Sequence, residues 1–169
     1  MESPKNTETQ EKVNALIDDL TCDDVISCQN ARRLLVNIGE MAVPRLIEAL
    51  SDQREWVRWE AIKALGEIGG PEAVNVLLKA LENKRFDIRW LAAEGLIREG
   101  KPVAVPLLEE LIARPESVWL RQGAHRIFRD LEHTDYQAIL HPVSEAIESN
   151  DPSVQIPIAA KSALDKLRR

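Results

Sequence analysis

One segment of the chain nearly repeats itself after a constant interval. Residues 57–69 read VRWEAIKALGEIG, and residues 88–100 read IRWLAAEGLIREG. The shared Arg, Ala, Leu and Gly positions of the two copies are each 31 residues apart. A fixed period of this size is typical of arrays in which each repeat is a pair of helices stacked on the next pair. The period divides the 169-residue chain into about five repeats, which is enough for neighbouring repeats to bury a continuous core.

The segments around these copies have the pattern of a helix, a short turn and a second helix. Apolar side chains form one helical stripe in five first-helix segments, which are residues 16–20, 46–50, 77–81, 107–111 and 143–147. Gly39, Gly69 and Gly100 each follow a predicted second helix, where a left-handed cap residue is favoured. Asp52 and Glu55 have the spacing of a capping box before the next helix. No segment has the pattern of a strand, so the sequence predicts an all-α fold.

We expect the chain to have two parts. Residues 1–10 are rich in Thr, Glu, Asn, Lys and Pro, which favours a flexible N-terminal tail. Residues 11–169 are then expected to form a single repeat domain. The spacing from Leu111 to Ile147 is 36 residues, which places an insertion near residues 132–138. Terminal repeats commonly deviate in this way because one of their faces meets water.

The charge balance limits the class of partner. The chain has a formal net charge of −6 and a pI of about 5.2, whereas proteins that grip a nucleic-acid backbone show a basic surface. No apolar run approaches the ~20 residues of a transmembrane helix, and the polar start lacks the apolar segment of a secretory signal. Cys22 and Cys28 are too few for a disulfide framework and are expected to be reduced. We therefore expect a cytoplasmic protein whose partner is another protein. A monomer is slightly favoured over an oligomer.

The repeated motifs resemble HEAT-like repeats. The shared pattern is a Val-Arg pair, an Ala position and an Ala-Leu-Gly-x-Ile-Gly end, followed by a turn into an Ala-Val-x-x-Leu helix. Residues 39–50 match the corresponding junction of the short prokaryotic subtype, the phycobilisome-lyase-type repeats. The resemblance covers roughly residues 13–167 and is strong over 43–100. It implies a right-handed α-solenoid of about five two-helix repeats, with the second helices lining a concave face, but it implies a function less firmly.

Two tryptophans are the clearest candidates for function. At about 100° per residue, Trp59 falls on the charged side of its helix, and Trp90 does the same one repeat later. Tryptophan is enriched at the centres of protein interfaces. By the resemblance this side is the concave face, and ten residues on it are expected to contact a partner: Trp59, Glu60, Lys63, Glu67, Trp90, Leu91, Glu94, Arg98, Gln122 and Arg126. The alternative is that each indole packs on the next repeat and completes the core.

Other recurring residues are predicted to be structural. The recurring arginines lie at the edge of the apolar stripe, at Arg58, Arg89 and Arg121. A guanidinium at this position can bind acidic or carbonyl groups of adjacent turns, which is favoured over the alternative that the arginines bind a row of phosphates. Trp56 and Trp119 occupy equivalent first-turn positions and are expected to pack at the edge of the core. Surface or packing roles are expected for the three histidines, which are His125, His133 and His141. The sequence predicts no catalytic residue, metal or cofactor.

We expect a non-catalytic scaffold that binds a partner protein through the concave face. The main alternative, by resemblance, is a bilin-lyase-like or other lyase subunit that acts with a partner chain. Deoxyhypusine hydroxylases hold a di-iron centre through repeated His-Glu pairs, and this activity is disfavoured because the matching positions read Trp59-Glu60 and Trp90-Leu91. A DNA glycosylase-like nucleic-acid binder is also disfavoured, since it needs a basic groove and this one mixes both charges.

Overall fold

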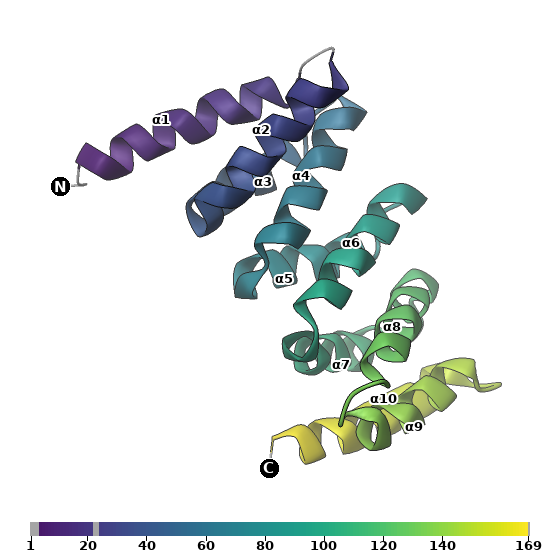
Figure 1. Cartoon of the computed structure of the whole chain (residues 1–169). Coiled ribbons are helices and arrows are strands. Elements are labelled where there is room, and N and C mark those ends of the chain that lie inside the picture. The colour runs from purple at the N-terminus through teal and green to yellow at the C-terminus, as the bar shows by residue number, and fades with distance from the viewer. Residues whose placement is uncertain (1–3, 22–23, 169) are drawn as a thin grey trace. The chain divides into compact units, whose positions relative to one another are not determined.

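The computed structural model describes residues 4–21 and 24–168, and its regular elements in those ranges are all helices (Figure 1). The α-helices are α1 (Pro4–Asp19), α2 (Val25–Ile38), α3 (Val43–Ala49), α4 (Glu55–Ile68), α5 (Gly70–Ala80), α6 (Phe86–Glu99), α7 (Ala104–Ala113), α8 (Val118–Leu131), α9 (Gln137–Glu148) and α10 (Pro152–Leu167). Short 3-10 segments, Gly39–Ala42 and Lys101–Val103, precede α3 and α7. The prediction of an all-α fold of paired helices is confirmed.

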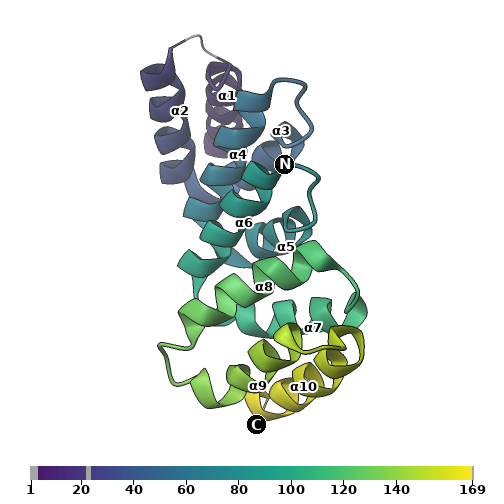
Figure 2. The ribbon, with the colours of Figure 1, turned by 90° about the vertical axis from the view of Figure 1, so that its right-hand side faces the viewer.

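The helices group into two compact units, Met1–Leu77 and Leu78–Arg169, with the boundary inside α5. In the first unit, α2 packs against α1 and α4, and α3 packs against the same two helices. One layer therefore contains α2 and α4, which lie next to each other in Figure 2, and the other contains α1 and α3. This is the arrangement of two successive helix pairs. The expected single domain over residues 11–169 stays a prediction.

The last helix pair of the second unit exchanges layers. A regular repeat would place α9 beside α7 and α10 beside α8, but α9 packs on α8 and α10 packs on α7 (Figure 2). The connection from α8 to α9 spans residues 132–136, within the insertion that the sequence indicates. A hydrogen bond between His125 Nε2 and Glu148 Oε1, at 2.7 Å, links α8 to α9. The longer connection thus lets a first helix, α9, follow α8 in the layer of second helices.

Helix α1 begins earlier than the sequence indicates. Residues 4–10 are helical, whereas a flexible tail was expected over residues 1–10. The buried side chains that hold α1 lie further along, at Val13, Leu16 and Ile17. The described side chains of the preceding turns, over residues 6–12, are mostly exposed, but these turns contain Lys, Glu and Gln, which favour a helix, and proline is tolerated in a first turn. Residues 1–3 lie outside the described part of the chain.

Equivalent positions of the repeats build the core in the same way. Leu65 in α4 and Leu96 in α6 are both fully buried, and burial of such a side chain contributes about 1.5–3 kcal/mol. Each helix then ends at a glycine whose N–H donates to that leucine's carbonyl, Gly69 with φ 70° and Gly100 with φ 77°. Only glycine adopts this backbone conformation readily. The predicted cap positions are therefore confirmed.

The recurring arginines hold the turn before each second helix. Arg58, Arg89 and Arg121 each donate a hydrogen bond from Nη1 to the carbonyl oxygen six residues earlier, at 2.5, 2.7 and 2.9 Å. These carbonyls belong to the turns, where no helical partner exists for them. The structural prediction for the three arginines is confirmed.

The capping box predicted at Asp52 and Glu55 is wrong. The N-cap of α4 is Arg54, which makes no side-chain cap. Asp52 instead accepts hydrogen bonds from the Arg54 backbone N–H, at 2.8 Å, and from its guanidinium, at 2.9 and 2.8 Å. One repeat later, the Asn83 side chain accepts from the Arg85 N–H at 2.9 Å. This position therefore closes the turn, as short polar side chains commonly do.

The bonds to Arg54 predict an acid-dependent contribution to stability. They lower the pKa of Asp52 from 3.8 to about 2, mainly through the guanidinium hydrogen bond. Because the folded-state pKa is the lower one, the contribution is present above pH 3.8 and is lost as the pH falls toward 2. Asp52→Asn, which copies Asn83, removes this dependence. In urea unfolding, the free energy of unfolding of the wild type should exceed that of Asp52→Asn, and this difference should shrink as the pH falls. A difference that does not change with pH would contradict the assignment.

Candidate functional site

In the first unit, three of the expected partner contacts gather around Arg32 of α2. Glu60 is fully buried, and its Oε2 accepts a hydrogen bond from Arg32 Nε at 2.7 Å. Glu67, seven residues or about two turns further along α4 and partly exposed, accepts from Arg32 Nη1. Lys63 Nζ lies 3.7 Å from Glu60 Oε1, which has no hydrogen-bond partner among the described residues. Glu60 thus belongs to a buried ion-pair network between α2 and α4, which differs from the solvent-facing position that was expected.

Trp59 is half-buried on the same helix. The centroids of the Trp59 and Trp56 rings are 5.1 Å apart with a tilt of 49°, a favourable geometry for an aromatic pair. Lys63 Nζ lies 4.6 Å from the Trp59 centroid, so a cation covers the ring. Trp56 packs against a neighbouring ring, as expected for it. Trp59 therefore combines a packing contact with a partly accessible surface.

In the second unit, large apolar side chains gather in the N-terminal halves of α6 and α8. Phe86 is 68% exposed, Trp90 48%, Val118 53% and Trp119 39%. Single exposed apolar residues are common on proteins, but a contiguous group marks an interaction surface more often. Trp90 was expected to face solvent, and it does so more fully than Trp59.

Arginine side chains cover the faces of these rings. The Cζ atom of Arg126 lies 3.3 Å from the Trp90 centroid, and Arg89 Cζ lies 4.7 Å from that of Trp119. The Phe86 and Trp90 centroids are 6.1 Å apart. Alternating guanidinium and aromatic groups thus connect α6 to α8, and contacts of this kind contribute about 0.5–2 kcal/mol each.

These side chains surround a cavity of about 170 Å3, which we call the aromatic pocket. Its lining includes Phe86, Trp90 and Trp119, with Arg89 and Arg126 as the charged groups and Leu81, Ala93, Gln122 and Gly123 completing it. A wider hollow of about 670 Å3 also uses Trp90 and Arg126, together with Glu94, Ile97, Arg129, Asp130 and His133. We call the pocket and this hollow together the α6–α8 groove.

The expected contacts of the second unit divide between the groove and its surroundings. Trp90, Gln122 and Arg126 line the aromatic pocket. Glu94 is exposed and forms an ion pair with Arg126 Nη2. Leu91 is half-buried on α6, and Arg98 is exposed near the end of that helix. The structure therefore places four of the six together: Trp90, Glu94, Gln122 and Arg126.

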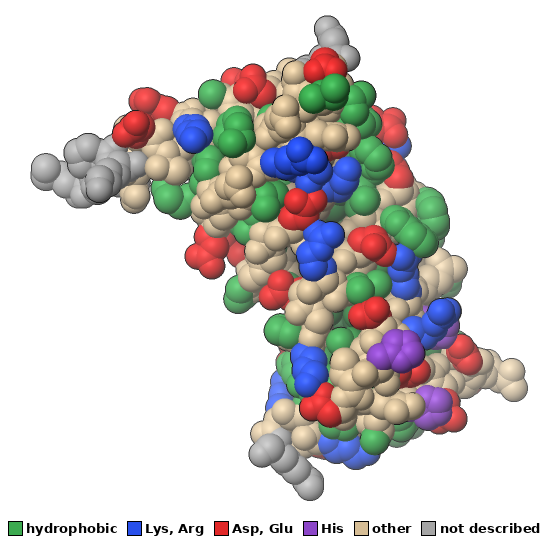
Figure 3. Space-filling view, in the orientation of Figure 1, with side chains coloured by type: hydrophobic (Ala, Val, Ile, Leu, Met, Phe, Trp, Pro, Cys, Tyr) green, Lys and Arg blue, Asp and Glu red, His purple; other side chains and the backbone are tan. Residues whose placement is uncertain are grey.

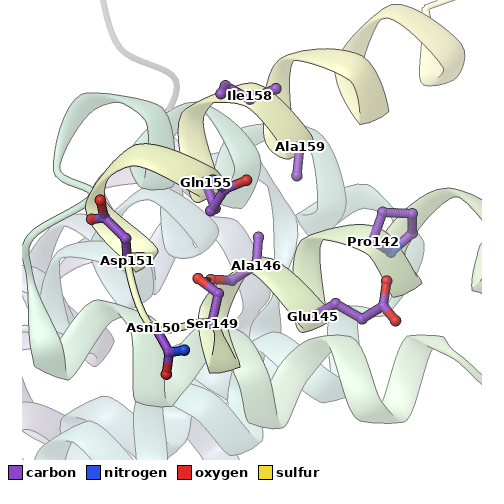
Figure 4. A pocket seen from close by; sticks show the side chains of 9 residues that line it. All are labelled: Pro142, Glu145, Ala146, Ser149, Asn150, Asp151, Gln155, Ile158 and Ala159. Atoms are coloured by element: carbon purple, nitrogen blue, oxygen red, sulfur yellow. Dashed lines mark hydrogen bonds between the residues drawn. The ribbon is translucent and has the colours of Figure 1, made fainter.

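A second hollow, of about 470 Å3, lies between α9 and α10 (Figure 4). Its charged lining groups, Glu145 and Asp151, are both acidic, and the remaining side chains are small, aliphatic or neutral polar. No aromatic ring or cation is among its lining residues. It lacks the anchors typical of an interface centre, which makes it a suitable comparison surface for experiments.

A model of HEAT repeats matches the sequence twice, over residues 13–96 and over residues 43–127. The two matches together span more than half of the chain. The chain belongs to the HEAT-repeat family. The matched region contains all of α6 and α8 as far as Ile127, so the aromatic pocket lies on HEAT repeats. No curated protein matches the sequence. HEAT repeats stack into extended surfaces that usually mediate protein interactions, and the phycobilisome-lyase subtype stays a prediction.

The sequence-based predictions for this HEAT-repeat protein missed one residue of the aromatic pocket and gave two others a different role. Phe86 stands where the preceding repeat has Glu55, and this exchange of a charged for an aromatic residue at an exposed helix start was the available signal. Arg89 was assigned to the turn, which it does bind, but its guanidinium also covers Trp119. Trp119 was expected to pack at the core edge and instead remains exposed.

The remaining candidate ligands of the HEAT-repeat chain are dispersed. His141 lies 3.7 Å from both Glu132 and Glu145. Within the ranges that the structure describes, no three His, Cys, Asp or Glu side chains come together as a metal site would require. Cys28 is buried and disulfide-bonded, which corrects the expectation of a reduced thiol there, and Cys22 lies outside those ranges.

The surface carries both signs of charge. Acidic and basic side chains are interspersed over the face seen in Figure 3. Among the helices of the described residues, none combines the length and apolar character that crossing a bilayer requires.

Proposed function

We propose that this HEAT-repeat protein is a non-catalytic scaffold that binds a partner protein through the α6–α8 groove. The observation that carries the proposal is the group of exposed rings, Phe86, Trp90 and Trp119, around one pocket. Tryptophan and arginine supply most of the binding energy at many interfaces, and this pocket combines them. The chain leaves these rings accessible although their burial against a partner would be favourable.

The surrounding residues fit the rim of an interface. Glu94 and Gln122 are exposed polar groups that line the groove, while the exposed Arg98 and the half-buried Leu91 lie elsewhere on α6. A polar rim around an apolar centre is the usual composition of protein interfaces. We include these residues in the proposed contact surface. The monomeric state expected from the sequence remains part of the same proposal. The disulfide at Cys28 removes one ground for the expected cytoplasmic location, which therefore stays a prediction.

The first unit is proposed to offer a separate, weaker contact. Trp59 and Lys63 are half-buried and retain accessible surface. The carboxylates of Glu60 and Glu67 are bound to Arg32, so we assign them to the stability of the unit.

Site-directed photo-crosslinking tests the proposal. A benzophenone amino acid at Gln122, which lines the aromatic pocket, is expected to capture a partner protein in a cell extract of the source organism. The matched probe stands at Ile158, an exposed apolar residue of α10 at the comparison hollow. The partner is then purified and its affinity for the full chain is measured by calorimetry. A partner captured only from position 158 would contradict the proposed site.

A further inference from the structure

The size of the aromatic pocket indicates what it holds. Sites for drug-sized ligands typically have volumes of about 300–1,000 Å3, whereas this pocket has about 170 Å3. Its rings, Leu81 and Ala93 make the lining mostly apolar. A space of this size and character suits one large apolar side chain that projects from a longer chain.

The charge of α8 indicates what accompanies that side chain. The whole protein has a net charge of −6, yet α8 carries three arginines and one aspartate. The charged groups that line the aromatic pocket itself, Arg89 and Arg126, are both cationic. Arg126 pairs through Nη2 with Glu94, and its buried Nη1 has no hydrogen-bond partner among the described residues. The Arg126 side chain is 30% exposed as a whole, so a carboxylate beside the pocket can pair with the accessible part of the guanidinium, and charge-assisted bonds of that kind are strong.

Nucleic acid would offer negative charge too, but the groove does not suit it. Binding of a single strand relies on bases that stack on open aromatic faces. Here Arg126 lies 3.3 Å above Trp90, and Arg89 lies 4.7 Å from the Trp119 centroid, so a cation already covers a face of each ring. Glu94 and Asp130 line the adjoining hollow, where they would repel the successive phosphates of a longer strand, whereas a single carboxylate at the aromatic pocket meets only cationic lining groups.

We propose that the α6–α8 groove binds an acidic peptide segment, with one of its large apolar side chains in the aromatic pocket and a neighbouring carboxylate on Arg126. This inference rests on the protein-binding function proposed above and specifies the chemistry of the partner. The basic helix α8 explains how a protein with a negative net charge can attract an acidic peptide to this surface. Charge complementarity of this kind guides association and selects among partners.

The test selects ligands without assuming a sequence. The full chain is panned against a library of short random peptides displayed on phage. We expect the enriched peptides to carry Asp or Glu next to Leu, Phe or Trp. Fluorescein-labelled synthetic copies are then titrated by fluorescence polarisation, together with a labelled oligothymidine, which is expected not to bind.

Three variants separate the two parts of the ligand. Arg126→Gln should weaken the enriched peptides by about 30-fold or more, as expected when a paired charge is removed. A Cβ atom at Gly123 would lie 2.9 Å from Leu81 Cδ2, so Gly123→Ala crowds the pocket without changing its charge. We expect this variant to bind the enriched peptides about tenfold more weakly. Replacement of the apolar residue in the peptide should abolish the difference in affinity between the wild type and this variant. Arg33→Gln, on an exposed position of α2, is the charge-matched control and should leave affinity unchanged.

The outcomes distinguish this inference from the broader one. Enrichment of basic peptides, unchanged affinity with Arg126→Gln, or tighter binding of the oligothymidine would each overturn the acidic ligand. If such peptides still lose affinity with Trp90→Ala, the groove remains a protein-binding site for another class of partner. Failure of the crosslink from Gln122 removes the broader proposal independently of the peptide result.

Discussion

Replacement of Arg32 by alanine is expected to lower the free energy of unfolding by about 3–5 kcal/mol, because it leaves a buried carboxylate without its partner. Glu60 is fully buried, and its Oε2 is bound by Arg32 at 2.7 Å. Lys63, at 3.7 Å from the other oxygen, is too distant to replace that hydrogen bond. Urea unfolding of the full chain measures the loss. Hydrogen exchange should show that α2 and α4 open first, since stability in repeat arrays is largely local.

Two comparisons identify the cause of that loss. Arg33→Ala removes an adjacent, exposed arginine from the same helix and is expected to change stability by less than about 0.5 kcal/mol. The double variant Arg32→Met/Glu60→Leu removes both charges and should recover most of the loss, because an apolar pair of similar volume often replaces a buried ion pair without cost. If the double variant is as unstable as Arg32→Ala, the buried charge is not the cause. An Arg32→Ala chain as stable as the Arg33→Ala chain would contradict the network itself.

Replacement of Trp90 by alanine is expected to weaken partner binding by about 2 kcal/mol or more, which is roughly a 30-fold rise in Kd. The ring is 48% exposed in the free chain, so its loss removes surface that a partner would bury. The melting temperature should fall by only a few degrees, because the change removes the contacts of the ring with Arg126 and Phe86 but no buried core. Calorimetric titration with the crosslinked partner or an enriched peptide gives the affinity, and differential scanning calorimetry gives the stability.

Trp59→Ala is the matched comparison for that experiment. Its ring is half-buried and packs on Trp56 at 5.1 Å, so this change should lower the melting temperature more than Trp90→Ala does. We expect a smaller effect on binding than at Trp90. A Trp90→Ala chain that melts much earlier but binds as tightly as the wild type would assign the indole to packing.

The fold follows from the sequence because its determinants are local and periodic. Gly69 and Gly100 end equivalent helices with positive φ, and Leu65 and Leu96 fill equivalent core positions. Each repeat contacts mainly its neighbours, so a pattern within one repeat predicts most of its packing. The layer exchange of α9 and α10 was not predicted. An insertion is visible in the sequence, but the side of α8 on which the next helix packs depends on contacts between repeats.

The candidate site was only partly predictable for a related reason. A helical wheel orders residues on one helix, and it correctly places Trp90 on the accessible side. It does not show Arg32 reaching Glu60 from another repeat, or Arg126 covering Trp90 from the next one. Phe86 was missed because it lies in the first turn, outside the apolar stripe that the period reveals.

Hydroxyl-radical footprinting of the full chain, alone and with its partner, tests the groove most directly because it reports the solvent access of single side chains. We predict that oxidation of Phe86, Trp90 and Trp119 slows when the partner is bound, while that of the exposed Val154 and Ile158 on α10 stays the same. Unchanged oxidation of Trp90 in the complex, with protection on α10 instead, would contradict the proposed binding surface.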